Sequence, residues 1–420
     1  MPMKKILLKP CLAAVALALS MGASAQKRDD AVFAAAQAAQ AAVIDTLQKL
    51  VLIESGSANI AGIARVADFA QARLNALGAK TERIKSTNSD RAIVKGVLTG
   101  KGRLKVMLIA HMDTVYPEGI LATQPYKLDG NRLYGPGIAD DKGGIAVILH
   151  ALAVLQSQGW NDFATVTVLF NSDEEIGSGG SGDLIQSLAA EHDVVLSYEP
   201  TAAKSMAKVE GVLLSAAGTA TATMEVKGRA SHAGAAPQEG RNALIELSHQ
   251  MLATEHIAKD IPGAQLNWTH AQGGLVRNQI PESAVATADV RLLQPDAADK
   301  LKAALIAKTQ ESKRVPDTHV HIKMDVGRPP YVAGERGMAL AQRARAIYAE
   351  LDGRALFFHP VTGGGTDAGF ASGSGKAVVL ESLGLAGWGF HARDEYIEID
   401  SIVPRLYLTA RLLQDLGKQP

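Results

Sequence analysis

Short runs of nearly uninterrupted apolar residues alternate with helical segments in the first half of this chain. Residues 103–110, 165–170 and 193–198 are predicted strands, and residues 143–158 and 181–191 between them are predicted helices. A strand that is apolar at successive positions buries both of its faces, which requires a sheet covered by helices on both sides. The alternation of strand and helix favours a mostly parallel sheet of the α/β class.

The residue pattern changes after about residue 215. Three segments, 218–228, 284–292 and 318–324, alternate polar and apolar residues, as half-exposed antiparallel strands do, and helical segments lie between them. The α/β pattern then resumes with a predicted helix over residues 337–351. This change predicts a separate α+β unit inserted into the first domain.

The length of the chain agrees with two domains, because 420 residues exceed the usual size of one domain. We predict a catalytic α/β domain with a helix-covered, mostly parallel sheet, formed by residues 26–215 and 327–420. The inserted α+β domain comprises residues 216–326.

The N-terminus has the three-part pattern of a secretory signal peptide. Residues 1–10 contain three lysines and no acidic residue, residues 11–22 are apolar or small, and residues 23–25 read Ala-Ser-Ala. This pattern predicts a leader over residues 1–25 that is cleaved near Ala25, and export to the periplasm or the medium. A packed N-terminal helix is the alternative. No later apolar run reaches membrane-spanning length, so no membrane anchor is expected.

Composition narrows the possible functions. The 43 basic residues balance 43 acidic residues, which argues against nucleic acid as the main partner. The single cysteine, Cys11, can form neither an internal disulfide nor a CxxC-type zinc site. Any metal would therefore be held by His, Asp and Glu.

Acidic and imidazole side chains follow the three predicted strands. His111 and Asp113 follow the first strand, residues 173–175 (Asp-Glu-Glu) the second and Glu199 the third, and Asp140 precedes the apolar helix. Each piece has a simpler explanation, because adjacent acids are usually solvated and an aspartate there can cap a helix. However, ligands bind at the carboxyl ends of parallel strands, so the joint placement predicts one site.

Longer segments around these residues resemble the co-catalytic zinc aminopeptidase–carboxypeptidase family that includes the aminoacylases. The order and spacing of the segments are similar to those of the bacterial glutamate carboxypeptidases of the folate-hydrolysing, carboxypeptidase G type. The segments are HMDTV at 111–115, GIADDKGG at 137–144, DEE at 173–175, EP at 199–200, ASHAGAAP at 230–237, TGGGTDA at 362–368 and GFH at 389–391.

The resemblance implies two zinc ions per subunit, with cobalt or manganese as possible substitutes. Asp140 would bridge the two metals, since two nearby dications need a shared anion. His111 and Glu199 would complete the ligands of one metal, and Glu175 and His391 those of the other. Two histidines and three carboxylates suit zinc.

The resemblance also assigns catalytic roles. Glu174 would act as general base and acid, and Asp113 would orient the ring of His111. His232 in the inserted domain would reach a neighbouring active site and stabilise the oxyanion, so this domain would serve as a lid and a dimerisation surface. The alternative for His232 is an ordinary hydrogen-bonding loop histidine.

Arg291 and Asn278 match residues that would bind the terminal carboxylate of the substrate, which a guanidinium can hold with two hydrogen bonds. Gly364 and Gly365 would let backbone N–H groups approach a bound anion. An ordinary edge-strand arginine and a flexible turn are the alternatives. A lysine that contacts substrate in the related enzymes has two candidates here, Lys204 and Lys208.

The implied function is an exported, zinc-dependent exopeptidase that acts as a homodimer. It would remove a C-terminal amino acid, glutamate by resemblance, from small N-acyl or peptidyl substrates such as folates. An aminoacylase, a desuccinylase or a dipeptidase would use the same metal site and remain alternatives. A catalytically silent metal- or peptide-binding protein is a further alternative, which the intact Glu174 disfavours.

Overall fold

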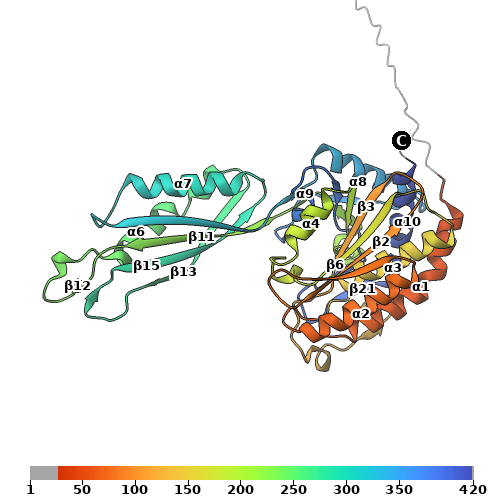
Figure 1. Cartoon of the computed structure of the whole chain (residues 1–420), viewed down its shortest axis with the longest axis horizontal. Coiled ribbons are helices and arrows are strands. Elements are labelled where there is room, and N and C mark those ends of the chain that lie inside the picture. The colour runs from red at the N-terminus through yellow and green to blue at the C-terminus, as the bar shows by residue number, and fades with distance from the viewer. Residues whose placement is uncertain (1–26, 419–420) are drawn as a thin grey trace, which may run out of the picture.

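The computed structural model describes residues 27–418, and the predicted leader over residues 1–25 lies outside them. The described chain forms a helix-covered α/β domain and an elongated α+β domain that projects away from it (Figure 1). Within the described residues, no helix is both long and apolar enough to cross a membrane.

A six-stranded sheet forms the centre of the catalytic domain. Its four strands from β6 to β19 are parallel, whereas β1 and β2 add antiparallel strands at one edge. The order is β1 (Lys80–Lys85), β2 (Ala92–Thr99), β6 (Thr165–Asn171), β3 (Lys105–His111), β7 (Val194–Ser197) and β19 (Val378–Leu380). The predicted, mostly parallel sheet is therefore confirmed, and the antiparallel pair β1–β2 was not predicted.

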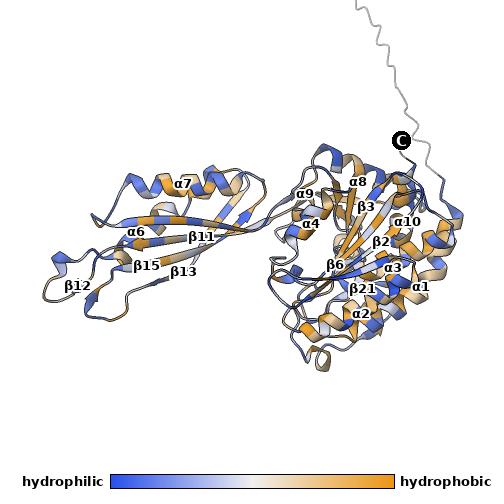
Figure 2. Cartoon of the chain, viewed as in Figure 1, coloured by the Kyte–Doolittle hydropathy of each residue, from blue (hydrophilic) through white to orange (hydrophobic). Residues whose placement is uncertain are grey.

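Both faces of this sheet are buried. Val106 and Leu108 of β3 belong to the large core on one side, while Met107 and Ile109 belong to the core on the other side. This burial explains the nearly continuous apolar strands, whose colour stands out in Figure 2. The large core is covered by α1 (Asp30–Val51), α2 (Ile60–Ala76), α3 (Lys142–Ser157), α8 (Gly334–Ala349) and α10 (Ile402–Gly417), and the other core by α4 (Gly182–Ala189) and α9 (Ala368–Ser372).

A second, five-stranded sheet brings distant segments together beside the first. Its strand β20 pairs in parallel with β8, so that Gly387 lies opposite Ala202. The segment after Glu199 therefore lies beside the segment that leads to His391. The order is β4 (Lys127–Asp129), β5 (Arg132–Tyr134), β21 (Tyr396–Glu398), β20 (Ala386–Trp388) and β8 (Thr201–Ala202).

The inserted domain is an antiparallel sheet with two helices on one face. Along β11, alternate residues such as Ala222 and Met224 are buried against the helices, as the alternating pattern predicted. The strand order is β13 (Ala264–Gly273), β15 (Ser283–Leu292), β11 (Gly218–Lys227) and β16 (His319–Arg328), and the helices are α6 (Ala243–Thr254) and α7 (Ala297–Glu311). The chain enters this domain through β11 and leaves it through β16.

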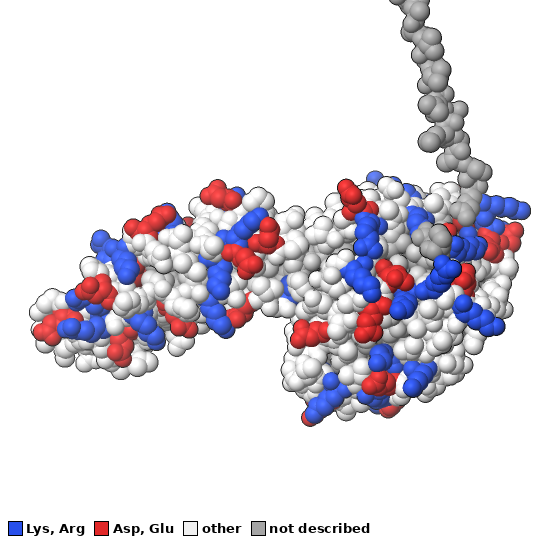
Figure 3. Space-filling view, turned by 45° about the horizontal axis from the view of Figure 1, so that its top comes forward, with Lys and Arg blue, Asp and Glu red and all other residues white. Residues whose placement is uncertain are grey.

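A short two-stranded antiparallel sheet of β12 (Ser231–His232) and β14 (Gln279–Ile280) forms the tip of the inserted domain farthest from the catalytic domain (Figure 1). Basic and acidic side chains are interspersed over the visible face of both domains (Figure 3). This distribution matches the balanced composition and shows no extended basic surface on that face.

Candidate active site and metal centre

A cavity of about 930 Å³ lies at the carboxyl ends of the parallel strands. The catalytic domain contributes most of its wall, and Thr219 and Arg291 of the inserted domain contribute the rest. The acidic and imidazole residues that line it are Asp140, Glu174, Glu175, Glu199, His359 and His391. The predicted convergence of strand ends on one site therefore holds in the tertiary structure.

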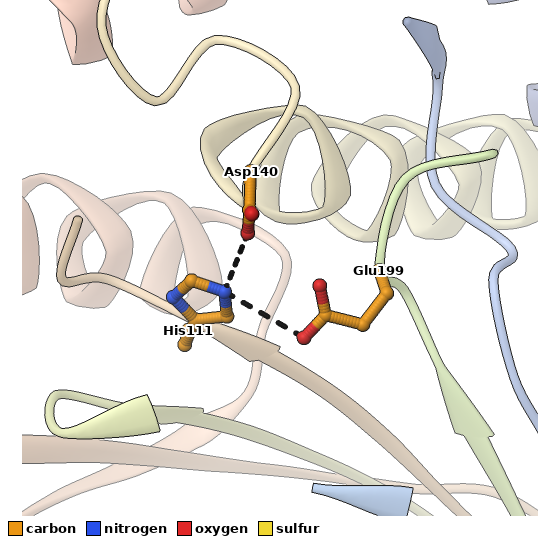
Figure 4. Close-up of side chains that lie close together, drawn as sticks. All are labelled: His111, Asp140 and Glu199. Carbon is orange, nitrogen blue, oxygen red and sulfur yellow. Dashed lines mark hydrogen bonds and ion pairs between the residues drawn. The ribbon is translucent and has the colours of Figure 1, made fainter. Parts of the chain in front are cut away.

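His111, Asp140 and Glu199 form the first of two groups with the spacing of metal ligands (Figure 4). His111 is the last residue of β3, and its Nε2 lies 3.0 Å from Oδ1 of Asp140 and 3.6 Å from Oε1 of Glu199. The His111 side chain is almost fully buried, with 1% exposed. One cation at this position would contact all three side chains.

Asp140, Glu175 and His391 form the second group. Nε2 of His391 lies 3.4 Å from Oδ2 of Asp140 and 3.2 Å from Oε2 of Glu175. Asp140 thus directs one carboxylate oxygen to each group. The arrangement fits two cations that share Asp140 as a ligand, and imidazole and carboxylate groups suit zinc.

The charges of the cavity also fit cations. Three carboxylates converge, and burial raises the pKa of Glu199 well above its ordinary value and raises that of Glu175, with further increases from the charge of Asp140. Hydrogen bonds to Asp140 and Glu175 raise the pKa of His391 to about 10. Excess negative charge in a buried site is stabilised by bound cations, so the donor set is suited to a metal.

Asp113 connects His111 to the turn that carries Glu174 and Glu175. Nδ1 of His111 lies 3.0 Å from the backbone oxygen of Asp113 and 3.4 Å from its carboxylate, so the carbonyl is the nearer partner of the ring. The carboxylate accepts hydrogen bonds from the backbone N–H groups of Glu174 (3.1 Å) and Glu175 (3.3 Å) and from the Ser57 hydroxyl (2.8 Å). Asp113 therefore holds both the histidine and the acidic turn.

Glu174 contacts an arginine that the sequence pattern did not single out as functional. Nη1 of Arg328 donates to Oε1 of Glu174 at 2.5 Å, and Nη2 donates to the Glu174 backbone oxygen and to the Ser178 hydroxyl. Burial raises the pKa of Glu174 well above its ordinary value, although the charge of Arg328 opposes this shift. The only sequence signal for Arg328 was its position at the predicted domain border, directly before two prolines.

Glu395 is a second residue that the pattern did not reveal. Its buried carboxylate accepts hydrogen bonds from the backbone N–H groups of Gly137 (2.8 Å), Ala139 (2.9 Å) and Asp140 (3.1 Å), and from the Tyr116 hydroxyl (2.8 Å). Burial raises the pKa of Glu395 to about 7. These contacts hold the loop that presents Asp140, and no short motif identifies such a remote partner.

The predicted substrate-binding residues fall into two places. Arg291, Gly364 and Gly365 line the cavity, and Nε of Arg291 lies 3.0 Å from Oδ2 of Asp289. His232 instead lies in β12 at the far tip of the inserted domain, and Asn278 lies beside it, directly before β14 (Figure 1). The structure therefore does not bring these two residues to the cavity of their own chain.

The two candidate lysines do not line the cavity. Nζ of Lys204 lies 3.3 Å from Oε1 of the buried Glu210 and 3.6 Å from Oδ2 of Asp400, and Lys208 is exposed after a short helical turn. Lys204 therefore forms ion pairs with two carboxylates. Lys208, by contrast, directly follows Ala207, which lines the cavity.

Comparison with known proteins places the chain in a family. Residues 107–415 match the sequence model described as peptidase family M20/M25/M40. Carboxypeptidase G2 of Pseudomonas sp. (strain RS-16) is 46% identical over 399 residues, which cover 94% of each chain. Succinyl-diaminopimelate desuccinylase of Gluconobacter oxydans (strain 621H) is 28% identical over 330 residues, covering 74% of this chain and 81% of the relative.

The fold agrees with this match. The solved structure of the M20 family metallo-carboxypeptidase Sso-CP2 from Sulfolobus solfataricus is similar with a TM-score of 0.68 and 18% sequence identity, and the match covers 90% of this chain and 99% of that one. At this identity the likeness shows the shared fold. Together with the sequence matches, it shows that the chain belongs to peptidase family M20/M25/M40.

Proposed function

We propose that this protein is a zinc-dependent exopeptidase that removes a C-terminal glutamate from N-acyl or peptidyl substrates such as folates. The observation that carries the proposal is the position of Asp140, whose two carboxylate oxygens face two separate groups of ligands. The 46% identity to carboxypeptidase G2 supports the choice of substrate. His111 and Glu199 would hold one zinc ion, and Glu175 and His391 the other.

Zinc, when bound, polarises a carbonyl and lowers the pKa of water. Glu174 would accept a proton from the attacking water and return it to the leaving amine, because its buried carboxylate lies at the cavity wall and has a raised pKa. Asp113 would hold Glu174 and Glu175 in a fixed position relative to His111, because its carboxylate accepts hydrogen bonds from both of their backbone N–H groups.

The substrate would be oriented by the part of the cavity that lies nearest the inserted domain. Arg291 is the guanidinium available to the terminal carboxylate, and Gly364 and Gly365 allow backbone N–H groups to approach it. The Arg291–Asp289 pair is about 40% exposed. Replacing the Asp289 carboxylate by the substrate carboxylate as the partner of Arg291 therefore carries a small electrostatic penalty.

His232 and Asn278 would act in the active site of a second subunit. They lie too far along the inserted domain to serve their own cavity. This position supports a homodimer in which the tip of each inserted domain reaches the active site of the other subunit (Figure 1). In such a dimer, His232 would donate a hydrogen bond to the oxyanion.

An aminoacylase, desuccinylase or dipeptidase with the same metal site is the second candidate, supported by the similarity to a desuccinylase. A panel of N-acyl amino acids that differ only in the C-terminal residue separates these functions. The expected result is a preference for glutamate. Equal turnover of apolar C-terminal residues would favour an aminoacylase instead.

Replacement of the general base tests the mechanism. Glu174→Gln should bind two zinc ions per chain, as measured by elemental analysis, yet lose kcat by about 10²–10⁴-fold. The exposed Glu191→Gln serves as the matched control and should leave kcat unchanged. Activity of Glu174→Gln close to that of the unmodified enzyme would contradict the assignment.

Mixed dimers test the exchange of His232. Glu174→Gln and His232→Ala are each expected to be inactive alone, but a hybrid dimer retains one site with Glu174 and the partner's histidine intact. Mixing the two dissociated variants in equal amounts and letting them reassociate should restore about a quarter of the activity of the unmodified enzyme. Half of the random dimers are then hybrids, and each hybrid has one working site of two. Absence of recovery would argue against exchange.

We also propose that the protein is exported after cleavage near Ala25. The pattern of charge, apolar run and small residues over residues 1–25 supports this proposal. Mass spectrometry of protein recovered from the periplasm or medium should show Gln26 as the first residue.

A further inference from the structure

A short pair of parallel strands forms one wall of the candidate active-site cavity. Strand β9 (Gly211–Leu213) pairs with β18 (Phe357–His359), and Leu213 lies directly opposite His359. Residues opposite each other in neighbouring strands point to the same face of a sheet, as do residues two apart along one strand. Leu213, His359 and Val361 all line the cavity, and together they form what we call the β9–β18 wall.

The β9–β18 wall adjoins the part of the cavity proposed for the terminal carboxylate of the substrate. Val361 is followed by Thr362, whose hydroxyl accepts a hydrogen bond from the Gly364 N–H group (3.3 Å). Thr362, Gly364 and Gly365 line the cavity together with Arg291. The side chain of a C-terminal residue is attached to the carbon next to its carboxylate, so this side chain comes within reach of the wall.

His359 is the basic group of the cavity that has no other task. The basic side chains that line the cavity are Arg291, Arg328, His359 and His391. Arg328 is bound to Glu174, His391 lies among the proposed metal ligands, and Arg291 is assigned to the terminal carboxylate. Nε2 of His359 is buried and has no hydrogen-bond partner in the part of the chain that the structure describes. The imidazole is therefore available to a ligand.

The surroundings of the His359 ring determine which nitrogen can donate. A Cβ atom on Gly211 would lie 2.4 Å from Cδ2 and 2.6 Å from Nε2 of His359, so the ring has room only because residue 211 is glycine. The ring of Phe357 contacts the imidazole edge-on, with 4.9 Å between the centroids. Burial and the charge of Arg405 lower the pKa of His359, so the ring is neutral and carries one N–H group. Because the edge with Nε2 packs against Gly211, Nδ1 on the opposite edge is the donor left for a ligand.

We propose that His359 determines the specificity for glutamate by donating a hydrogen bond from Nδ1 to the side-chain carboxylate of the C-terminal residue. This inference rests on the proposed exopeptidase function. The methylene groups of the glutamate side chain would pack against the apolar Leu213 and Val361. A glutamine side chain accepts a weaker hydrogen bond because it is uncharged, and a norleucine side chain leaves the N–H group unpaired. The expected order of preference is therefore glutamate, glutamine, norleucine.

The test compares the N-acetyl derivatives of glutamate, glutamine and norleucine on the zinc-loaded enzyme. His359→Phe keeps an aromatic ring but has no N–H group, and it should lower the glutamate-to-norleucine ratio of kcat/KM by about 10–100-fold, mainly through the KM of the glutamate derivative. His359→Asn, whose amide can donate from near the position of Nδ1, should retain part of the preference. The ratio is the measure because a loss of folded or zinc-loaded protein lowers both kcat/KM values equally.

Two further variants serve as comparisons. His256→Phe, at a histidine whose side chain is 65% exposed in the inserted domain, is the matched control and should leave the ratio unchanged. Lys208→Met removes the cation that directly follows the cavity residue Ala207, and it should change the ratio less than His359→Phe does. A loss of the glutamate preference in Lys208→Met but not in His359→Phe would overturn the inference.

The unmodified enzyme separates this inference from the proposed function. If it prefers the glutamate derivative and His359→Phe keeps that preference in full, the proposed function stands and the inference about His359 is wrong. If the unmodified enzyme cleaves the norleucine derivative as fast as the glutamate derivative, the proposed substrate and the inference are both wrong.

Discussion

Arg328, the last residue of strand β16, donates a hydrogen bond of 2.5 Å from Nη1 to Oε1 of Glu174, and the two side chains are only 6% and 8% exposed. The strand that leaves the inserted domain therefore ends on the candidate general base. A second guanidinium nitrogen binds the Glu174 backbone oxygen, which fixes the turn as well as the carboxylate. This contact links the position of the inserted domain to the geometry of the active site.

Removal of Arg328 should damage both activity and stability. Arg328→Met leaves a buried carboxylate without its partner, which destabilises the fold by about 3–5 kcal/mol. Arg328→Lys keeps the charge but loses the second hydrogen bond, and an intermediate loss is expected. Urea unfolding and kcat/KM on an N-acylglutamate measure the two effects.

The matched control for Arg328 is Arg343, which is paired with Asp415 in the catalytic domain, where the two side chains are 28% and 33% exposed. Arg343→Met should change stability by no more than about 1 kcal/mol and leave kcat/KM unaffected. If Arg328→Met behaved like Arg343→Met in both measurements, the Arg328–Glu174 contact would contribute to neither activity nor stability.

Asp113→Asn should weaken metal binding rather than unfold the protein. The amide oxygen of asparagine still accepts hydrogen bonds, but the amide nitrogen accepts none. The hydrogen bonds that the two carboxylate oxygens of Asp113 accept from Glu174, Glu175 and Ser57 therefore cannot all form. A loss of about 10–100-fold in zinc affinity is expected, measured by competition with a chelator. Ser57→Ala, which removes only the hydroxyl partner, should show a smaller loss; the reverse order would contradict this role.

Glu395→Gln should loosen the loop that presents Asp140. The carboxylate accepts three backbone N–H groups, and an amide nitrogen in place of one oxygen would face at least one of these donors. We expect a lower zinc content and a Tm several degrees lower. Tyr116→Phe removes one hydrogen bond to the same carboxylate and should have a milder effect, so an equal or larger effect would point away from the loop.

His150 should make stability depend on pH in mildly acidic solution. Burial lowers its pKa from 6.5 to about 4, and Arg73 adds to this effect. The folded state therefore binds fewer protons than the unfolded state between pH 4 and 6.5, so stability falls as pH decreases through this range, by roughly 3 kcal/mol.

The His150 contribution is measured as the slope of unfolding free energy against pH. His150→Gln can keep a hydrogen bond to Thr46 without titrating, and its slope between pH 6.5 and 4 should be smaller than that of the unmodified protein. His256→Gln, at an exposed histidine, provides the control and should leave the slope unchanged. Identical slopes for all three proteins would rule out this role of His150.

Much of the fold and part of the site followed from local sequence patterns. The apolar runs predicted β3, β6 and β7, and the parallel arrangement predicted that His111, Glu175 and Glu199 meet at one edge. Strand β1 was missed because it lies at the edge of the sheet and consists largely of charged residues, and β2 was missed because Lys95 and Gly96 interrupt its apolar run. His391 was identified by family resemblance alone, since it lies in a loop.

The sequence by itself determined which segments are buried and where chemically active side chains follow the strands, because periodicity and strand ends are local properties. The tertiary structure alone decided that Arg328 meets Glu174 and that Glu395 holds the Asp140 loop, across 154 and 255 residues of sequence. It also decided that His232 lies far from the cavity of its own chain. Such relationships depend on how two domains and two sheets pack together, which no local pattern encodes.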